Sequence, residues 1–314
     1  MQPYPKHILN LQQQLETYVN AGMDISPKSE TEKALRTIGY YRLRGYCFQL
    51  YNNETKRYRD GTKFSDIVSL YRFDTELSHL IFGMLNSIEI SLRVRLVEAL
   101  LVHNDALILN DPAVFDDKKL YWQNHSALSS EIARSEDVFI KHNYDKHEGL
   151  IPVWAAVEVM SFGTLSKTIK NLKTGSGSSY SVLADYYKFR TKNGNMARPS
   201  KQMLSSWIHA ASIVRNICAH NGRLYNRSII PSPELTYYDR KGAVPRFTGL
   251  YQVLLAMKYL RPNDEEWKEF VKKLVYLLNK YKAVINMRKM NFPWDWKKHF
   301  SVDRIKEDEK HIID

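Results

Sequence analysis

Apolar residues recur every three or four positions along most of the chain, which is the spacing of one face of an α-helix. The alternation of polar and apolar positions that is typical of strands is almost absent. The longest periodic stretch extends from Ile67 to Ala99. It predicts a single helix of about 35 residues capped by Ser65, or two helices joined near Gly83. The pattern as a whole predicts an all-α fold, a helical bundle.

Shorter helices are predicted before this stretch. The first of them should bury a stripe made of Ile8, Leu11, Leu15 and Val19. Ser26 and Pro27 together form a typical helix start and Gly39 a typical helix stop, so these residues bound the second helix. A polar run then predicts an exposed loop, with a short hairpin around Asp60 and Gly61.

Further helices are predicted over residues 117–140, 152–173, 200–222, 249–261 and 264–288. The Gly/Ser-rich run at 174–179 is interpreted as a link inside the bundle, because the helical pattern resumes directly after it. We therefore divide the chain into an N-terminal helical segment (1–63), a helical core (64–290) and a C-terminal tail (291–314). The aromatic start of the tail is expected to dock and its charged end to fray.

The charge of the chain indicates which class of molecule it could bind. The chain has 46 lysine and arginine residues against 34 aspartate and glutamate residues, a formal net charge of +12. Such a surface attracts phosphates, and counterion release favours its binding to a polyanion. A net charge of this size also keeps proteins in solution, so solubility alone is the competing explanation. Together with 20 tyrosines that can stack on bases, the charge favours nucleic acid as the partner.

Other classes of protein are disfavoured. No run of apolar residues is long enough for a signal peptide or a membrane span, so we expect a cytoplasmic protein with no membrane partner. Cys47 and Cys218 are isolated in apolar segments, which is typical of reduced core thiols. The histidines form no metal-ligand motif, so we expect no metal and no cofactor.

One polar segment carries candidate chemistry. In IVRNICAHNGRLYNR, residues 213–227, Arg215 precedes His220 by five positions. A guanidinium can bind two phosphate oxygens at once, and an imidazole with a pKa near 6.5 can transfer protons near neutral pH. The segment ends a predicted helix at Asn221, and its apolar neighbours would fix the backbone while the histidine stays reachable.

The spacing alone carries little weight. Chance should give roughly two matches to Arg-x4–6-His in a chain of this composition. Two further matches are present, Arg72 with His79 on the long predicted helix and Arg304 with His311 in the charged tail. A histidine in the last turn of a helix is also favoured by the helix dipole without any function.

Helix geometry separates the two residues of the candidate pair. Arg215 lies about 140° around an ideal helix from His220, whereas Asn216 and His220 share one face. Within one chain Arg215 would have to reach around the helix. In a homodimer, two copies of the helix could line one cleft with the arginine and histidine of both chains.

The segment resembles the signature of the Abi-like (AbiD/AbiF) proteins of bacterial abortive infection, which belong to the HEPN superfamily. Four further blocks resemble that family in the right order: IGYYRLRGYCFQLY (38–51), FSDIVSLYRFDTEL (64–77), IEISLRVRL (88–96) and SFGTLSK (161–167). At Asn221 the family commonly has a second histidine, so an accessory role at this position is in doubt.

The resemblance implies a HEPN-type bundle with an N-terminal helical extension, and an RNA-binding, metal-independent endoribonuclease that acts as a toxin in phage defence. RNA supplies its own nucleophile, the 2′-OH. We expect His220 to act as general acid or base, Arg215 to clamp the phosphate and Asn216 to orient one of them. The alternative is a module of the same fold that binds a structured noncoding RNA without cutting it. Such an RNA is also a plausible regulator of the enzyme.

Weaker candidates surround this pair. The charged residues of the long helix could orient Arg215 by ion pairing, or could form surface salt bridges along their own helix: Arg72, Asp74, Glu76, Glu89 and Arg93. Arg223 and Arg227 follow the helix end and are the first choice for RNA-backbone contacts. Tyr41, Arg42 and Arg44 could stack on and clamp single-stranded RNA, although an edge of a tyrosine-rich core is the favoured interpretation of their segment.

Overall fold

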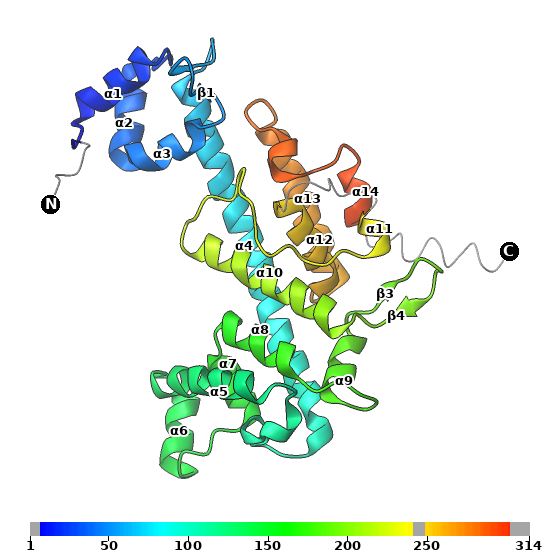
Figure 1. Cartoon of the computed structure of the whole chain (residues 1–314). Coiled ribbons are helices and arrows are strands. Elements are labelled where there is room, and N and C mark those ends of the chain that lie inside the picture. Colours follow the sequence, from blue (N-terminus) through cyan, green and yellow to red (C-terminus); the bar gives the residue numbers. More distant parts are fainter. Residues whose placement is uncertain (1–6, 241–248, 302–314) are drawn as a thin grey trace. The chain divides into compact units, whose positions relative to one another are not determined.

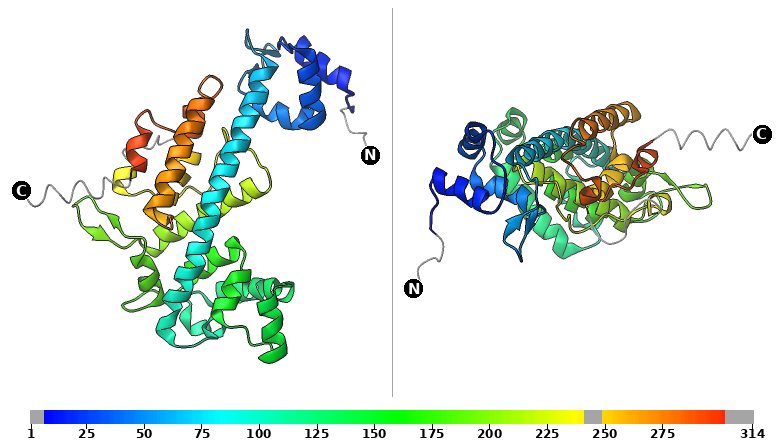
Figure 2. Two further views of the ribbon diagram at one scale, coloured as in Figure 1. Left: turned by 180° about the vertical axis from the view of Figure 1, so that it is seen from behind. Right: turned by 90° about the horizontal axis from the view of Figure 1, so that it is seen from above.

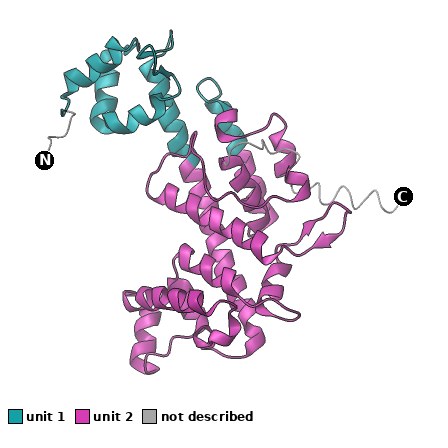
Figure 3. Ribbon diagram, in the orientation of Figure 1, with its two compact units in different colours: residues 1–77, 274–286 teal, residues 78–273, 287–314 magenta. Residues whose placement is uncertain are grey.

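The computed structural model describes residues 7–240 and 249–301. Helices account for most of these residues, so the all-α prediction is confirmed, while the HEPN type of the bundle stays a prediction. Contacts divide the chain into unit 1, Met1–Leu77 with Leu274–Asn286, and unit 2, Ser78–Lys273 with Met287–Asp314 (Figure 3). The domain boundaries drawn from the sequence are not tested by this division. Within the described ranges, no helix is both long and apolar enough to span a membrane.

Unit 1 is built from short helices, one hairpin and the ends of two long helices (Figure 1). Its elements are α1 (Leu11–Asn20), α2 (Lys28–Thr37), α3 (Tyr40–Cys47), β1 (Tyr51–Asn52), β2 (Arg57–Tyr58), the first part of α4 (Phe64–Leu100) and the last part of α13 (Asp264–Lys280). Aromatic rings form its core. The ring of Tyr18 packs against those of Tyr40, Tyr58 and Phe64, with centroids 5.1 to 6.3 Å apart.

The predicted buried stripe of the first helix is wrong at both ends. Ile8 is 97% exposed and Val19 is 49% exposed, whereas Leu15 and Tyr18 are buried. The large ring of Tyr18 takes the core position that the pattern assigned to Val19, so the buried face of the helix is offset by one residue from the aliphatic stripe. The start of α1 is capped by Asn10, whose side chain accepts a hydrogen bond from the backbone of Gln13.

Two local predictions in this unit need correction. Pro27, not Ser26, is the N-cap of α2, and no side chain caps that helix. The hairpin turns at residues 53–56 rather than at Asp60 and Gly61. The side chain of Asn52 favours this turn, because its Oδ1 accepts hydrogen bonds from the backbone nitrogens of Glu54 and Thr55. Lys56 completes the turn in the left-handed conformation.

Helix α4 is a single helix of 37 residues, which confirms the first of the two alternatives for this stretch (Figure 2). It begins at Phe64, one residue before the predicted cap, and continues through Gly83 without a break. Apolar side chains on one face are fully buried along its whole length, from Phe64 and Ile67 to Leu96 and Ala99. Their burial explains why one exposed glycine does not divide the helix.

Unit 2 contains the rest of α4 and the helices that follow it. Its further elements are α5 (Lys118–Ala133), α6 (Val138–Lys146), α7 (Val153–Val159), α8 (Phe162–Asn171), α9 (Ser179–Asp185), β3 (Phe189–Arg190), β4 (Met196–Ala197), α10 (Lys201–Ala219), α11 (Tyr237–Arg240), α12 (Leu250–Leu260), the main part of α13 and α14 (Trp296–Phe300), with short 3-10 turns at Leu101–His103, Ile108–Asn110, Pro112–Val114 and Met287–Met290. Within the described residues, the strands pair as two antiparallel hairpins, β1–β2 in unit 1 and β3–β4 in unit 2.

Several predicted helices are shorter than expected. Residues 117–140 form two helices, α5 and α6, and residues 152–173 form α7 and α8. The second break falls at Met160, because Ser161 caps α8 by accepting a hydrogen bond from the backbone of Thr164. The last predicted helix ends at Lys280 rather than at residue 288.

Helix α10 lies in the core of unit 2, packed against α8 and α12 (Figure 1). Its predicted apolar face is confirmed, since all five residues are buried: Leu204, Ile208, Ala211, Val214 and Cys218. Cys47 and Cys218 are buried free thiols, as predicted. The start of the tail docks within unit 2, where Trp296 and Phe300 are buried. Residues 302–314, with the Arg304 and His311 match, lie outside the described residues.

Candidate functional site

The candidate segment forms the C-terminal end of α10. His220 is the C-cap residue, directly after the last helical residue, and its side chain is exposed. The backbone nitrogen of Gly222 donates to the carbonyl oxygen of Ile217 at 2.7 Å, and that of Asn221 donates to Cys218 at 3.0 Å. These two bonds make a Schellman motif, which satisfies the last carbonyls of the helix. The backbone that carries His220 is therefore fixed on both sides.

Two residues make this helix end possible. Asn221 has φ of 51°, the left-handed conformation that asparagine tolerates better than most side chains. Gly222 has no room for a side chain, because an added Cβ would lie 3.0 Å from Cγ2 of Ile217 and 3.1 Å from its carbonyl oxygen. A histidine at position 221 would have to adopt the same left-handed backbone, which asparagine tolerates better.

The carboxylate of Glu89 lies between two arginines. Its Oε1 accepts a hydrogen bond from Nη2 of Arg93 at 2.7 Å, and its Oε2 lies 3.2 Å from Nη2 of Arg215. The Glu89 side chain is 5% exposed, against 16% for Arg93 and 29% for Arg215. Such pairs are screened less than surface salt bridges. Two positive charges and one negative charge leave the cluster with one positive charge beside the end of α10.

Arg93 connects this cluster to another part of unit 2. Its Nη2 also donates to the carbonyl oxygen of Met160 at 2.8 Å, at the joint between α7 and α8. Glu89 is thus held by an arginine that is itself held by the backbone. Through this chain of contacts, α4 and the α7–α8 joint fix the guanidinium of Arg215.

The exposed face of α10 carries the other polar groups. His209, Asn216 and His220 are all exposed and lie on one side, because spacings of seven and four residues return to the same face. Asn216 Oδ1 accepts a hydrogen bond from Nη1 of Arg215 at 3.2 Å. In the part of the chain that the structure describes, no hydrogen bond joins the side chains of Arg215 and His220. The arginine and the histidine of one chain are therefore not joined by a hydrogen bond.

Two lysines that the sequence reasoning missed lie beside this face. Lys167 and Lys170 are exposed on α8, which packs against α10. Partial burial, together with the positive charges of Lys170 and Lys167, holds the pKa of His209 below its usual value. The sequence contained a signal for this basic face: Lys167 and Lys170 are three residues apart, so they share one side of α8, and the apolar Leu165 and Ile169 are buried.

The predicted RNA contacts occupy different places. Arg223 is half-buried and Arg227 is exposed, both in the loop that follows α10 in unit 2. Nη1 of Arg227 donates to the carbonyl oxygen of Arg223 at 3.4 Å, so its side chain lies across this loop. Tyr41, Arg42 and Arg44 are exposed on α3 in unit 1, whose opposite face is buried. Their segment therefore has both a core face and a solvent face.

Two of the other charged candidates on α4 have partners of their own in unit 1. Asp74 is buried and accepts a hydrogen bond from the hydroxyl of Tyr46 at 2.7 Å. Glu76 accepts hydrogen bonds from Nζ of Lys280 at 2.8 Å and from the hydroxyl of Tyr281 at 2.6 Å. Arg72 is exposed and lines a pocket. Of the five candidates on α4, Glu89 is the one whose ion pair with Arg215 is present.

Among residues 7–240 and 249–301, no group of three or more His, Cys, Asp or Glu side chains is arranged to hold a metal ion.

Comparison with protein families gives one match. The model of a family described as Abi-like protein matches residues 33–226, more than half of the chain, including α10 and its end. No curated protein matches significantly. No solved structure matches either.

Proposed function

Because the chain belongs to the Abi-like protein family, which suggests a role in abortive-infection phage defence, we propose that it is a metal-independent endoribonuclease of HEPN type that acts there as a toxin. The observation that carries the proposal is the end of α10. There Arg215, tied to the buried Glu89, lies beside Asn216 and the exposed His220. A positioned cation next to a reachable imidazole is what cleavage of a phosphodiester requires.

The reaction needs no nucleophile from the protein. A base removes the proton of the RNA 2′-OH, the 2′-oxygen attacks the adjacent phosphorus, and the bond to the 5′-oxygen breaks as that oxygen receives a proton. The products are a 2′,3′-cyclic phosphate and a 5′-OH end, so protons and bonds balance. His220 is the proton-transfer group and Arg215 neutralises the crowded phosphorane. Glu89 and Asn216 hold the guanidinium in place.

A homodimer would complete this site. One imidazole can take the proton of the 2′-OH and, once protonated, give it to the leaving 5′-oxygen, so a single intact Arg215–His220 pair is enough for the reaction. Since Arg215 lies about 140° around an ideal helix from His220, a twofold arrangement of α10 could bring the arginine of one chain to the histidine of the other.

The RNA strand beyond the scissile phosphate needs further contacts. Lys167 and Lys170, exposed on α8, would bind phosphates on one side of the exposed face of α10. Arg223 and Arg227 are the corresponding groups past the helix end. Exposed side chains of α3 offer additional contacts in unit 1: Tyr41, Arg42 and Arg44.

The test compares two histidine variants. His220→Ala should lower the rate of cleavage of a labelled RNA by about 10²-fold or more, because it removes the general acid–base group, with RNA binding unchanged within a few fold. His79→Ala is the matched control, since His79 is exposed on α4 and belongs to another match to the Arg-His spacing, with Arg72. Equal loss in both variants, or full activity of His220→Ala, would contradict the proposal.

A mixing experiment tests the shared site. Arg215→Ala and His220→Ala proteins are each expected to be inactive, and their mixture should recover part of the activity through heterodimers with one intact pair. An active monomer in sedimentation, or no recovery in a mixture shown to exchange subunits, would place both residues in one chain. A wild-type protein that cleaves no RNA tested, yet binds a structured RNA with steep salt dependence, would instead support the non-cleaving alternative.

A further inference from the structure

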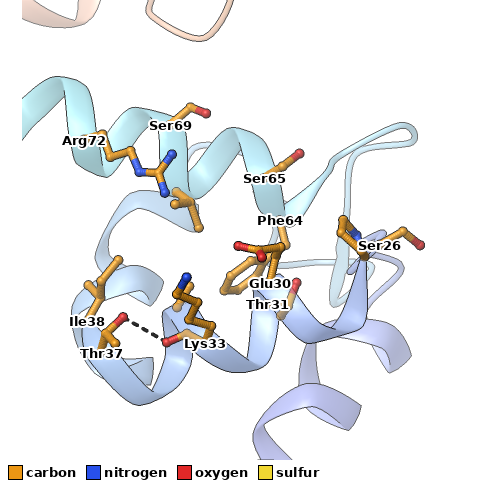
Figure 4. A pocket seen from close by; sticks show the side chains of 13 residues that line it. Ser26, Glu30, Thr31, Lys33, Thr37, Ile38, Phe64, Ser65, Ser69 and Arg72 are labelled. Atoms are coloured by element: carbon orange, nitrogen blue, oxygen red, sulfur yellow. Dashed lines mark hydrogen bonds between the residues drawn. The ribbon is translucent and has the colours of Figure 1, made fainter.

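A pocket of about 270 Å³ lies in unit 1 between α2 and the start of α4 (Figure 4). Its walls come from the whole of α2 and from the first three turns of α4. Four apolar side chains form part of the wall: Ala34, Ile38, Phe64 and Val68. None of these lining residues belongs to the Arg215 site of unit 2.

Three charged side chains line the same pocket without pairing. They are Glu30 and Lys33 on α2 and Arg72 on α4. In Figure 4 the ends of Lys33 and Arg72 turn toward the space between the two helices. Within residues 7–240 and 249–301, none of the three has an ion-pair partner, although opposite charges line one cavity. The lining therefore keeps two positive charges and one acceptor available to a ligand.

Hydroxyl groups and the helix start add to this character. Ser65 and Ser69 line the pocket one helical turn apart, and Arg72 follows Ser69 on the same face of α4. Thr31 and Thr37 use their hydroxyl protons within their own segment, on the carbonyl oxygens of Ile25 and Lys33, and keep free lone pairs. The first turns of a 37-residue helix also favour an anion through the positive end of its dipole.

We propose that this pocket binds a nucleotide 5′-monophosphate, either as a free nucleotide or as the 5′-phosphorylated end of an RNA strand. Lys33 and Arg72 would bind the phosphate, from opposite helices, as a point charge and a fork. Glu30 would accept a hydrogen bond from a ribose hydroxyl or a base amino group, and the apolar wall would cover the sugar or base. The volume lies just below the usual range for small-molecule sites, which suits a single nucleotide.

This binding does not depend on cleavage at Arg215 and His220. The pocket residues and the proposed catalytic residues belong to different units, and nucleotide binding can be measured without any reaction. Failure of one proposal therefore leaves the other standing.

The test is calorimetric titration of the full chain with nucleoside 5′-monophosphates, with the matching nucleosides and with inorganic phosphate. In a His220→Ala background, a short RNA with a 5′-phosphate is compared with the same RNA carrying a 5′-OH. Arg72→Gln and Lys33→Gln remove one positive charge each and keep a polar side chain. Arg36→Gln is the control, because Arg36 is exposed on α2 and does not line the pocket. Thermal unfolding shows that each variant is folded.

The expected result is binding of a monophosphate or of the 5′-phosphorylated RNA, weakened about tenfold or more by Arg72→Gln and by Lys33→Gln and within twofold of wild type for Arg36→Gln. Binding of the free nucleotide identifies that source, and binding of the RNA end alone identifies the other. No binding of any phosphate-bearing probe overturns the proposal. So does equal binding of nucleosides and monophosphates, or an equal loss in all three variants.

Discussion

The two arginines of the candidate pairs, Arg215 and Arg72, illustrate opposite ways of using a positive charge. Arg215 lies next to a carboxylate that is 5% exposed, and that carboxylate is shared with a second arginine. Arg72 lines a pocket with Lys33 and Glu30, and none of these has an ion-pair partner in the described part of unit 1. The first charge is fixed in position, whereas the second is available.

The difference shows what each arginine is suited for. A guanidinium held by a buried acid is preorganised, because its position does not change when charge develops on a substrate. It also carries part of the folding free energy, since its partner is costly to leave unpaired. An unpaired guanidinium contributes little to folding and gives up no ion pair when it binds a phosphate. Three comparisons between variants test this contrast.

The largest difference in stability is expected between substitutions of two glutamates. Glu89→Gln should lower the free energy of unfolding by roughly 2 to 3 kcal/mol, because two arginines lose the counter-charge that they share. Glu30→Gln should change it by less than about 0.5 kcal/mol, since Glu30 is exposed and forms no ion pair. Urea unfolding of both variants measures the contrast. Similar losses in the two variants would show that the Glu89 cluster is not a stability element.

A smaller effect is expected from the arginines themselves. Arg215→Gln should cost about 1 kcal/mol of folding stability, because Glu89 keeps its bond to Arg93 and Arg215 is partly exposed. Arg72→Gln should be neutral within about 0.5 kcal/mol. Thermal unfolding at one salt concentration, repeated at high salt, separates them. A loss for Arg72→Gln as large as that for Arg215→Gln would remove the distinction between fixed and available charges.

The smallest effect is expected from Lys167 and Lys170, two exposed lysines near His209 that are neither held by a buried acid nor part of the pocket. In the double alanine variant, the pKa of His209 should rise toward its usual value, because two positive charges that oppose its protonation are gone. The slope of log affinity for single-stranded RNA against log salt should fall in magnitude by about 1.4, or 0.7 for each lost phosphate contact.

Nuclear magnetic resonance titration of His209 and binding assays over a range of salt measure these two changes. Lys272→Ala with Lys273→Ala is the control, since both lysines face Glu269 on α13. An unchanged salt slope in the α8 variant would take Lys167 and Lys170 out of the RNA path.

The elements that could be predicted from the sequence are those whose burial is periodic. The face of α4 from Ile67 to Ala99 and the face of α10 from Leu204 to Cys218 are continuous in the sequence, and both helices form as expected. Breaks set by a single side chain were missed, as at Ser161, where a cap starts a new helix. The first helix was misjudged because one aromatic residue, Tyr18, outweighs two aliphatic ones.

The candidate site could be located but not assembled from the sequence. The polar helix end at His220 is a local feature, so its residues could be named in advance. Which acid faces Arg215 depends on the packing of two helices distant in the chain, and local spacing ranks Asp74, Glu76 and Glu89 alike. The lysines of α8 were missed for the same reason, because their importance arises from the contact of α8 with α10.

The end of α10 also contains a residue that can deamidate, Asn221. Asn221 is followed by Gly222, the pairing in which an asparagine side chain is most readily attacked by the next backbone nitrogen. In the folded chain that nitrogen donates a 2.7 Å hydrogen bond to Ile217, and the attack requires this bond to break. The Schellman motif therefore protects Asn221 from conversion to aspartate, a loss that heat accelerates. Fraying of the last turn of α10 beside His220 would expose Asn221 to this reaction.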